Sequence, residues 1–296
     1  MTAAKNEENL LPRLATSIIR QSVKPLLWVI VDDGSEDKTA SIIKDLKSKY
    51  NWVKGLRLHG GGRYSLSEYG DVLKKGFEYA IRECKQMRIN YDFLGIVDAD
   101  IVLGTRYFEK LLKESEENSK LGIASGIIWE KNEKMNFQTT ENVRGAAMFI
   151  RRECYEMIDG ISSPVSPDTV LIVKAKNRGW QVRTFHCVKA IHQRKTFGKI
   201  NSRRACKELG EENYYLNYHP INAFLTGIYY AVNGSPSKGL SFLVGYSASF
   251  LLKKKKIGDE EIKEYFWSSF NRLLVRVSER YIWKNERLRQ LHRGKQ

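Results

Sequence analysis

Along the first 200 residues, apolar and polar positions fall into blocks that predict strands and helices in alternation. Short apolar runs are typical of buried strands, whereas apolar residues spaced three and four apart predict helices with one buried face. The runs predict strands at residues 26–31, 53–58, 93–97, 121–128, 146–150 and 187–191. The helical spacing predicts helices at residues 9–21, 37–49, 70–88 and 105–115. This alternation predicts an α/β fold with a mainly parallel, Rossmann-like sheet and flanking helices.

Two of the predicted strands end in acidic residues. The first run is followed by Asp32 and Asp33, and the third run by Asp98 and Asp100. In open α/β sheets ligands bind outside the carboxyl ends of the strands, so both clusters are expected to border one site. A hard divalent cation that bridges to phosphates would keep these carboxylates ionised. Helix capping would explain a single aspartate or serine after a strand, but it does not explain a paired Asp-x-Asp.

The pattern changes after about residue 199. Two apolar segments follow, at residues 221–232 and 240–252, and both are too short to span a bilayer as a helix. Four lysines, residues 253–256, follow the second segment directly. From Asp259 we expect a long amphipathic helix with apolar residues on one face and arginines on the other.

The net charge of the chain, +16 at pH 7, is distributed unevenly. Residues 1–173 contain 25 of the 50 Lys and Arg and 25 of the 34 Asp and Glu, so the whole excess lies beyond them. A basic segment indicates a polyanionic partner: a nucleoside diphosphate, an anionic membrane surface or nucleic acid. Nucleic-acid binding would not explain the acidic clusters, so we expect no nucleic-acid partner. We therefore expect two domains: a catalytic domain at residues 1–200 and a basic amphipathic helical region at residues 201–296.

Two interpretations of the apolar segments after residue 199 stay open. They form either an added helical core or a hairpin that lies in the plane of a membrane. Tyr229, Tyr230 and Tyr246 suit a membrane interface, and each lysine of residues 253–256 adds about 1 kcal/mol of attraction near anionic lipid. These features favour association with an anionic membrane surface.

The cysteine pattern and the first residues bear on the compartment. Cys84, Cys154, Cys187 and Cys206 are widely scattered and lack zinc-ligand spacing, which is typical of free thiols in a reducing compartment. The first residues lack the apolar core of a signal peptide. We expect a cytoplasmic protein that is attached peripherally to the cytoplasmic face of the cell membrane.

Four ordered motifs carry a resemblance to a known family. They are Asn-Glu-Glu-Asn at residues 6–9, Val-Asp-Asp-Gly-Ser-Glu-Asp-Lys-Thr at 31–39, Val-Asp-Ala-Asp at 97–100, and a segment at 143–153. In this order and spacing they resemble the family 2 inverting glycosyltransferases, whose nucleotide-sugar-binding domain has the GT-A fold. The resemblance covers roughly residues 2–200. The chain begins at the tail of the family's first strand, so we expect that most of this strand is missing.

The resemblance implies roles for the acidic residues. Asp100 would ligate a divalent cation, Mn²⁺ or Mg²⁺, that neutralises the charge developing on the leaving diphosphate. Asp98 would lie at the ribose of the nucleotide sugar and at the metal. Asp32, Asp33 and Glu7 would receive the base and the ribose hydroxyls.

An inverting enzyme also needs a base that deprotonates the acceptor hydroxyl. The family places a carboxylate for this purpose on a later helix, in a segment that ends in Gly-Trp or Gly-Tyr. Here that segment is residues 167–180, in which Asp168 is the sole carboxylate and hence the predicted base. The family's usual second carboxylate is absent. The alternative interpretation of Asp168 is a helix N-cap after Pro167.

His192 and Arg194 follow the last predicted strand. In some GT-A enzymes a histidine near this point completes the metal shell, and a basic neighbour meets the diphosphate. We therefore expect His192 as a metal ligand and Arg194 at the diphosphate, which a guanidinium binds in bidentate fashion. The alternative is an exposed histidine at a strand end that has no role.

The resemblance predicts transfer of a sugar from a nucleotide sugar to a hydroxyl of a lipid-linked or growing glycan. The segment at residues 214–220 is similar to one in polysaccharide-building members of the family, which agrees with such an acceptor. A polyprenyl-phosphate sugar synthase of the same fold is an alternative. A sugar-nucleotide nucleotidyltransferase is another, although it would need a Gly-rich phosphate loop with a lysine near the N-terminus, and the chain has none.

Overall fold

The computed structural model describes residues 1–59, 69–130, 140, 143–194 and 202–268. The chain forms two compact units, Met1–Gly198 and Lys199–Gln296. Cys84, Cys154, Cys187 and Cys206 are all free thiols, as their spacing predicts.

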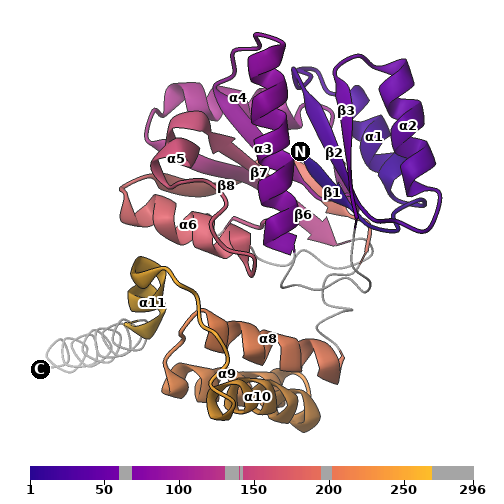
Figure 1. The fold of residues 1–296 in the computed structure, drawn as a ribbon. Coiled ribbons are helices and arrows are strands. Elements are labelled where there is room, and N and C mark those ends of the chain that lie inside the picture. Colours follow the sequence, from indigo (N-terminus) through magenta and orange to yellow (C-terminus); the bar gives the residue numbers. More distant parts are fainter. Residues whose placement is uncertain (60–68, 131–139, 141–142, 195–201, 269–296) are drawn as a thin grey trace, which may run out of the picture. The chain divides into compact units, whose positions relative to one another are not determined.

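The first unit begins with a fully parallel three-stranded sheet in the order β1-β2-β3 (Figure 1). β2 is almost entirely buried along its length because helices cover both of its faces, which explains its continuous apolar run. β2 pairs with β1 and β3 in parallel, so that Asp32 lies opposite both Ala4 and Arg57. The bounds are Thr2–Ala4 for β1, Trp28–Asp33 for β2 and Val53–Leu58 for β3.

A second sheet has five strands in the order β4-β7-β6-β8-β5. Only β6 and β8 run parallel in it, whereas the other neighbouring pairs are antiparallel. The bounds are Phe93–Val97 for β4, Ile101–Leu103 for β5, Leu121–Glu130 for β6, Ala147–Arg151 for β7 and Gln181–His192 for β8. The unit thus combines a parallel sheet with a mixed one.

The two sheets meet between β1 and β4. The amine of Met1 donates to the carbonyl of Gly95 at 2.8 Å, and the amide of Val97 donates to the carbonyl of Met1 at 3.0 Å. This is the hydrogen-bond pattern of a parallel pair. The carboxyl ends of β2 and β4 therefore open toward the same edge, as expected for strands that carry one site.

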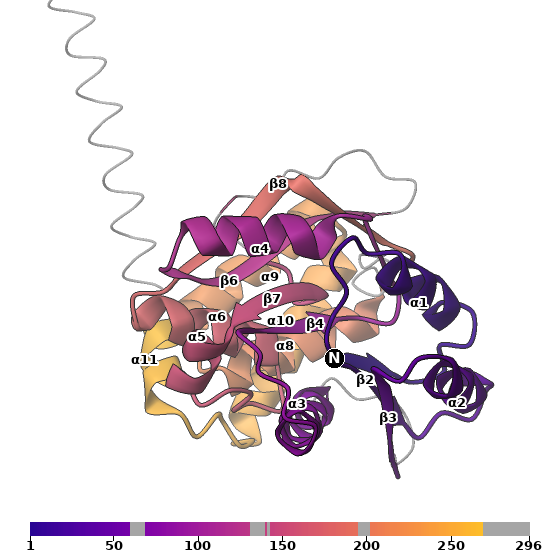
Figure 2. The ribbon, with the colours of Figure 1, turned by 90° about the horizontal axis from the view of Figure 1, so that it is seen from above.

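Helices cover both faces of these sheets (Figure 2). Alternate residues of one strand serve opposite faces, so Val97 packs in a core with α1, α2 and α4 while Ile96 packs in a core with α3, α5 and α6. The bounds are Leu11–Ile19 for α1, Thr39–Lys49 for α2, Tyr69–Gln86 for α3, Tyr107–Glu117 for α4, Arg152–Met157 for α5 and Pro167–Asn177 for α6.

The second unit is helical in its described part. Its core consists of Cys206, Tyr214, Ala223, Phe242 and Tyr246. Its helices are α8 at Arg203–Tyr215, α9 at Pro220–Asn233, α10 at Pro236–Leu251 and α11 at Glu260–Trp267.

Glycines let two helices of this unit approach closely. A Cβ on Gly210 of α8 would lie 2.0 Å from the carbonyl oxygen of Phe242, and one on Gly245 of α10 would lie 2.0 Å from that of Lys207. Any larger residue would force α8 and α10 apart.

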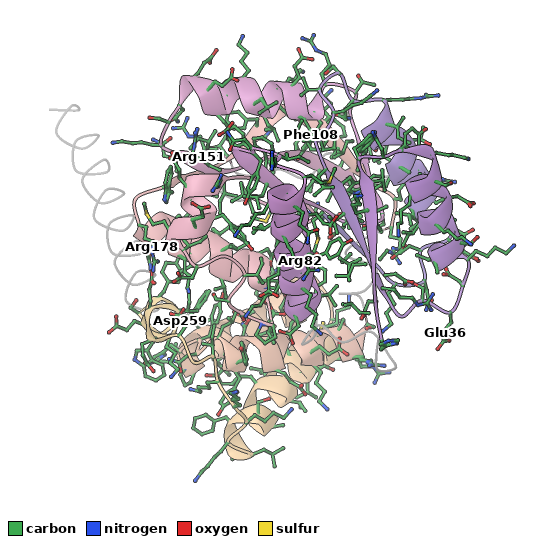
Figure 3. The ribbon with its side chains drawn as sticks, turned by 45° about the horizontal axis from the view of Figure 1, so that its top comes forward. Glu36, Arg82, Phe108, Arg151, Arg178 and Asp259 are labelled. Carbon is green, nitrogen blue, oxygen red and sulfur yellow. The ribbon has the colours of Figure 1, made fainter. Side chains whose placement is uncertain are left out.

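The end of the second unit agrees with the sequence pattern as far as it is described. Asp259, labelled in Figure 3, accepts a hydrogen bond from the amide of Ile262 and caps α11. Ile262 and Phe266 are buried on the same side of this helix. The expected continuation of the long helix lies in residues 269–296, outside the described part.

The interfacial roles predicted for three tyrosines need correction. Tyr229 is exposed, but Tyr246 is buried and donates its hydroxyl to the carbonyl of Tyr218 at 2.7 Å. Tyr230 packs against the core of the second unit. The interfacial role predicted for Tyr246 is therefore wrong, Tyr230 is partly buried, and Tyr229 is exposed as that role requires. No helix in the described ranges has the length and apolar content needed to cross a bilayer.

Candidate active site

The turn between β4 and β5 carries Asp98 and Asp100. The amide of Ile101 donates to the carbonyl of Asp98 at 3.1 Å, which closes the turn. The hydroxyl of Tyr69, at the start of α3, donates to the Asp98 carboxylate at 2.6 Å. Burial raises the pKa of Asp98 to about 6; the negative charge of Asp100 adds to the shift, and the Tyr69 hydrogen bond opposes it.

Asp100 receives two cationic side chains from the end of β8. Nε of Arg194 lies 2.8 Å from Oδ2 of Asp100, and Nε2 of His192 lies 3.1 Å from the same oxygen. The antiparallel pairing of β5 with β8 places Ile101 opposite His192, which brings these segments together. Burial would raise the pKa of Asp100, but its hydrogen bonds to His192 and Arg194 and their charges outweigh this and hold it at about 2.

Arg194 also joins the two acidic clusters. Its Nη2 donates to the carboxylate of Glu7, a buried residue between β1 and α1. The amide of Glu7 in turn donates to the hydroxyl of Thr39, at the start of α2, at 2.8 Å. Arg194 and Glu7 thus connect Asp100, after β4, with the start of α2, which follows β2.

His192 is buried and lies between two carboxylates. Beyond Asp100, its Nδ1 lies 3.6 Å from Glu130, the last residue of β6, which is buried and pairs with Arg144 at 2.9 Å. Burial opposes protonation of His192, but the hydrogen bond to Asp100 and the charges of Asp100 and Glu130 raise its pKa. An exposed histidine without a role, the alternative interpretation, does not match this position.

Glu130 and Arg144 were not predicted as site residues. Glu130 follows the apolar run of β6 in the same way that Asp98 follows the run of β4, and this signal was present in the sequence. Arg144 lies in the segment that resembles the acceptor side of the family. Its contact with Glu130 spans only 14 residues, but those residues include part of the chain outside the described ranges.

Asp168 lies in the first turn of α6, whose N-cap is Ser166, so Asp168 is not the N-cap itself. It packs against Gly145, where a Cβ would lie 2.3 Å from Oδ2 of Asp168. Burial raises the pKa of Asp168, although backbone amides of the helix turn and of Gly145 donate to it. Asp168 lies close enough to Asp98 for its charge to raise the pKa of Asp98.

At the other acidic cluster, Asp32 is buried and Asp33 is partly buried. Oδ1 of Asp32 accepts the amide of Ser35 at 2.9 Å, and Oδ2 lies 3.5 Å from Nη1 of Arg57. Among the described residues, Oδ2 has no hydrogen-bond donor. Asp33 pairs with Lys5 at 3.3 Å.

The donor atoms around Asp100 suit a divalent cation in their chemistry. Two carboxylates and an imidazole are ligands that Mn²⁺ accepts, and the shifted pKa of Asp98 indicates two acidic groups that share one environment. Within the described ranges, no three such side chains converge into a ready-made metal site. Arg194 occupies Oδ2 of Asp100, and its side chain is 43% exposed.

The family model described as "Glycosyl transferase family 2" matches residues 1–172 of the chain. This is more than half of the 296 residues, and the chain belongs to that family. The family sets the chain apart from the nucleotidyltransferases that the acidic clusters also allowed.

Several known proteins are similar to this chain. An uncharacterized glycosyltransferase, EpsJ of Bacillus subtilis (strain 168), is 20% identical over 132 residues, which is 45% of this chain and 34% of EpsJ. The mannosyltransferase PcManGT of Pyrobaculum calidifontis, solved with GDP-Man and Mn²⁺, is 15% identical with a TM-score of 0.53 over 84% of this chain and 74% of its own.

TarS of S. aureus is also similar. It is 14% identical with a TM-score of 0.51 over 75% of this chain and 44% of TarS. Its residues 1–349 have been solved with UDP-GlcNAc, and that chain is 13% identical with a TM-score of 0.50 over 86% of this chain and 75% of its own. The chain thus spans about a third of EpsJ and under half of TarS, and these likenesses establish the GT-A fold of the first unit.

Proposed function

We propose that this chain transfers a sugar from a nucleotide sugar to an acceptor hydroxyl with inversion at the anomeric carbon. The observation that carries the proposal is the grouping of Asp98, Asp100 and Arg194 with Asp168 nearby. These residues supply in one place a cation-binding pair, a cationic partner for a diphosphate and a candidate base. The solved complexes of PcManGT with GDP-Man and of TarS with UDP-GlcNAc support a nucleotide-sugar donor.

The nucleoside of the donor would bind at the carboxyl end of β2. Asp32, Asp33 and Glu7 would receive the base and the ribose hydroxyls. The buried Oδ2 of Asp32, which lacks a hydrogen-bond donor in the described part, supports this assignment because an acceptor there can bind an N–H or O–H of the ligand. Arg194 would release Asp100 and Glu7 and would instead pair with the diphosphate.

Asp98, Asp100 and His192 would hold the cation. A bound Mn²⁺ or Mg²⁺ supplies charge neutralisation for the leaving diphosphate. His192 must lose its proton for this role. Because the pKa of His192 is raised, occupancy of the cation site should depend on pH. The Mn²⁺ complex of PcManGT supports a cation of this kind.

Asp168 would act as the base. Its raised pKa makes its carboxylate a better proton acceptor than an ordinary aspartate, and the effect of its charge on the pKa of Asp98 suits a base beside the donor. The acceptor oxygen would attack the anomeric carbon as its proton passes to Asp168. The bond to the diphosphate breaks on the opposite side, which inverts the configuration.

We further propose a lipid-linked or growing glycan as the acceptor and peripheral attachment at the cytoplasmic face of the membrane. The exposed apolar residues of α9 and α10 and the charge excess beyond residue 173 support this setting. A role in polysaccharide biosynthesis follows from such an acceptor.

The test is a screen of nucleotide sugars for diphosphate release and transfer in the presence of Mn²⁺. Asp168→Asn should retain donor binding but lose at least about a hundredfold in turnover, because only the base is removed. Asp100→Ala should lose both transfer and cation-dependent binding of nucleoside diphosphate. Asp45→Asn, at an exposed position on α2, is the matched control and should behave like the parent.

Three outcomes would contradict specific parts of the proposal. Full activity in EDTA would overturn the cation. Loss of donor binding in Asp168→Asn would make that residue a donor contact, and a retained anomeric configuration in the product, read by NMR, would exclude single displacement.

A further inference from the structure

Helices α9 and α10 form an antiparallel hairpin with an apolar outer side. Gly227 lies against Leu243, and Gly239 lies against Ala231, so the two helices pack closely along their inner sides. The large apolar side chains of the outer side are exposed. On α9 they are Ile221, Phe224, Leu225, Ile228, Tyr229 and Val232, and on α10 they are Leu240, Val244 and Leu251.

Their spacing of three or four residues on α9, and of four and seven on α10, places each set on one face of its helix, opposite the buried face. Val232 and Leu251 are 78% and 77% exposed, which is nearly full exposure for apolar side chains. Most of the exposed large hydrophobic side chains in the described part of the chain lie between Ile221 and Trp267. Such a concentration marks an interaction surface. We call these nine residues the hairpin face.

Lysines border the hairpin face where α10 ends. The amide of Lys253 donates to the carbonyl of Phe250, and the amide of Lys254 donates to the carbonyl of Ser249. This pattern is a Schellman-type helix end. Lys253 occupies its left-handed position with φ of 48°, where glycine is the favoured residue. Lys253, Lys254 and Lys255 are exposed beside Leu251 and Leu252, and Lys254 pairs with Glu211 at 3.3 Å.

The fourth lysine behaves differently. Nζ of Lys256 donates to Asn217 at 2.6 Å and lies 4.9 Å from the centre of the Tyr214 ring. It is thus part of the helical packing. In the described ranges, Lys253 and Lys255 have no ion-pair partner, so their charges are available to a ligand.

We propose that the hairpin face, with Lys253 and Lys255 at its border, lies in the interfacial plane of an anionic lipid bilayer. Apolar side chains with a basic border are complementary to acyl chains beneath anionic headgroups. A neutral protein groove would match the apolar residues but would leave these lysines unpaired. This inference deepens the membrane attachment proposed above, and its test needs no sugar transfer, so its failure would leave the transferase proposal intact.

Lys253→Gly is the sharpest variant. Glycine relieves the left-handed backbone of Lys253, so the full-length protein should be at least as stable as the parent in thermal unfolding. Loss of the charge should weaken binding to vesicles of phosphatidylcholine with about a third phosphatidylglycerol by roughly fivefold. Binding to phosphatidylcholine alone should not change.

Leu251→Ser tests the apolar part. It should weaken binding to both kinds of vesicle by about tenfold, because a nearly fully exposed leucine is the group inserted. Leu26→Ser and Lys49→Gln are the matched controls on the first unit, since both residues are exposed there. Neither should change vesicle binding.

The proposal fails if Lys253→Gly weakens binding to both vesicle types equally, or if neither hairpin variant differs from its control. It also fails if the parent protein does not bind vesicles and light scattering shows a dimer that Leu251→Ser dissociates. That result would assign the hairpin face to a second copy of the chain.

Discussion

Asp98 and Asp100 are one residue apart, yet their pKa values move in opposite directions. Asp100 is held at about 2 by two cationic partners, whereas Asp98 reaches about 6 because it is buried beside negative charge and receives only a hydroxyl. A buried carboxyl whose pKa is raised by burial and by neighbouring negative charge suits a ligand that supplies positive charge. This contrast leads to two predictions at the level of single residues.

The first prediction concerns pH and cation binding. Because the folded-state pKa of Asp98 is raised to about 6 from 3.8, its stabilising contribution is full below about pH 4 and is lost as pH rises to about 6. A cation that binds ionised Asp98 should reverse this loss. Mn²⁺ should therefore raise the melting temperature more at pH 7 than at pH 5.

Asp98→Asn is the control for that measurement. It should reduce the decline in stability between about pH 4 and 6, leaving the part due to Asp168, whose pKa is also raised, and should remove most of the response to Mn²⁺. The lowered pKa of Asp100 acts below this window, since its stabilisation is lost only as pH falls below about 4 toward 2. An equal response to Mn²⁺ at both pH values would contradict the assignment of Asp98 to the cation.

The second prediction concerns Glu130. Its charge, 3.6 Å from Nδ1 of His192, helps to raise the pKa of that histidine. Glu130→Gln should lower the pKa of His192, measured by NMR titration, and should cost stability because partly buried Arg144 loses its ion pair with Glu130. Glu117→Gln, at an exposed position on α4, should change neither quantity. An unchanged pKa of His192 would show that Glu130 acts on Arg144 alone.

At the scale of elements, the packing of one helix against one loop positions the base. α6 presents Asp168 in its first turn, and the approach of Gly145 leaves no room for a side chain at that point. The fit between α6 and the segment before β7 therefore determines where the Asp168 carboxylate lies.

Gly145→Ala should displace Asp168 without unfolding the protein, because its added methyl group would lie 2.3 Å from Oδ2. A displacement of about 1 Å costs on the order of a hundredfold in turnover, while binding of the nucleotide sugar should be retained. Gly95→Ala is the matched control, since its Cβ would meet its nearest neighbour at an ordinary 3.5 Å. Steady-state kinetics and calorimetry separate the two quantities, and normal turnover in Gly145→Ala would show that Asp168 need not stay in place.

At the scale of the whole molecule, the chain divides into a unit that contains the acidic site, with 32 Lys and Arg against 25 Asp and Glu, and a helical unit with 18 against 9. The first unit contains every predicted site residue, and the second contains the hairpin face. If membrane attachment combines apolar insertion with charge attraction, salt should weaken vesicle binding but should not abolish it.

In about 1 M salt, where charges are screened within about 3 Å, binding to anionic vesicles should fall to the level found on neutral vesicles. It should not fall to zero, because the apolar contribution persists. Co-sedimentation across a salt series provides the measurement. Complete release by salt would contradict apolar insertion, and binding independent of salt would contradict the role of the lysines.

Much of this arrangement is visible in the residue pattern. The strand predicted at residues 53–58 is β3 in full, and the acidic residues that close β2 and β4 do lie at strand ends. Local alternation and terminal aspartates suffice here because both signals lie in residues that are neighbours in the chain. β8 begins at Gln181, ahead of the predicted residue 187, because its exposed positions interrupt the apolar pattern. β5 and α5 were missed because three and six residues are too few to show a period.

The pairing of the site residues depends on contacts that no local pattern contains. The Arg194 contacts with Asp100 and Glu7 join residues 94 and 187 positions apart in the chain, and strand register alone places Glu130 opposite His192. The residue types and their strand ends were therefore readable from the order of the chain. Which carboxylate has a raised pKa, which cationic side chain it meets and which glycine makes room for the base follow from burial and packing, because these properties exist only once distant segments exclude water together.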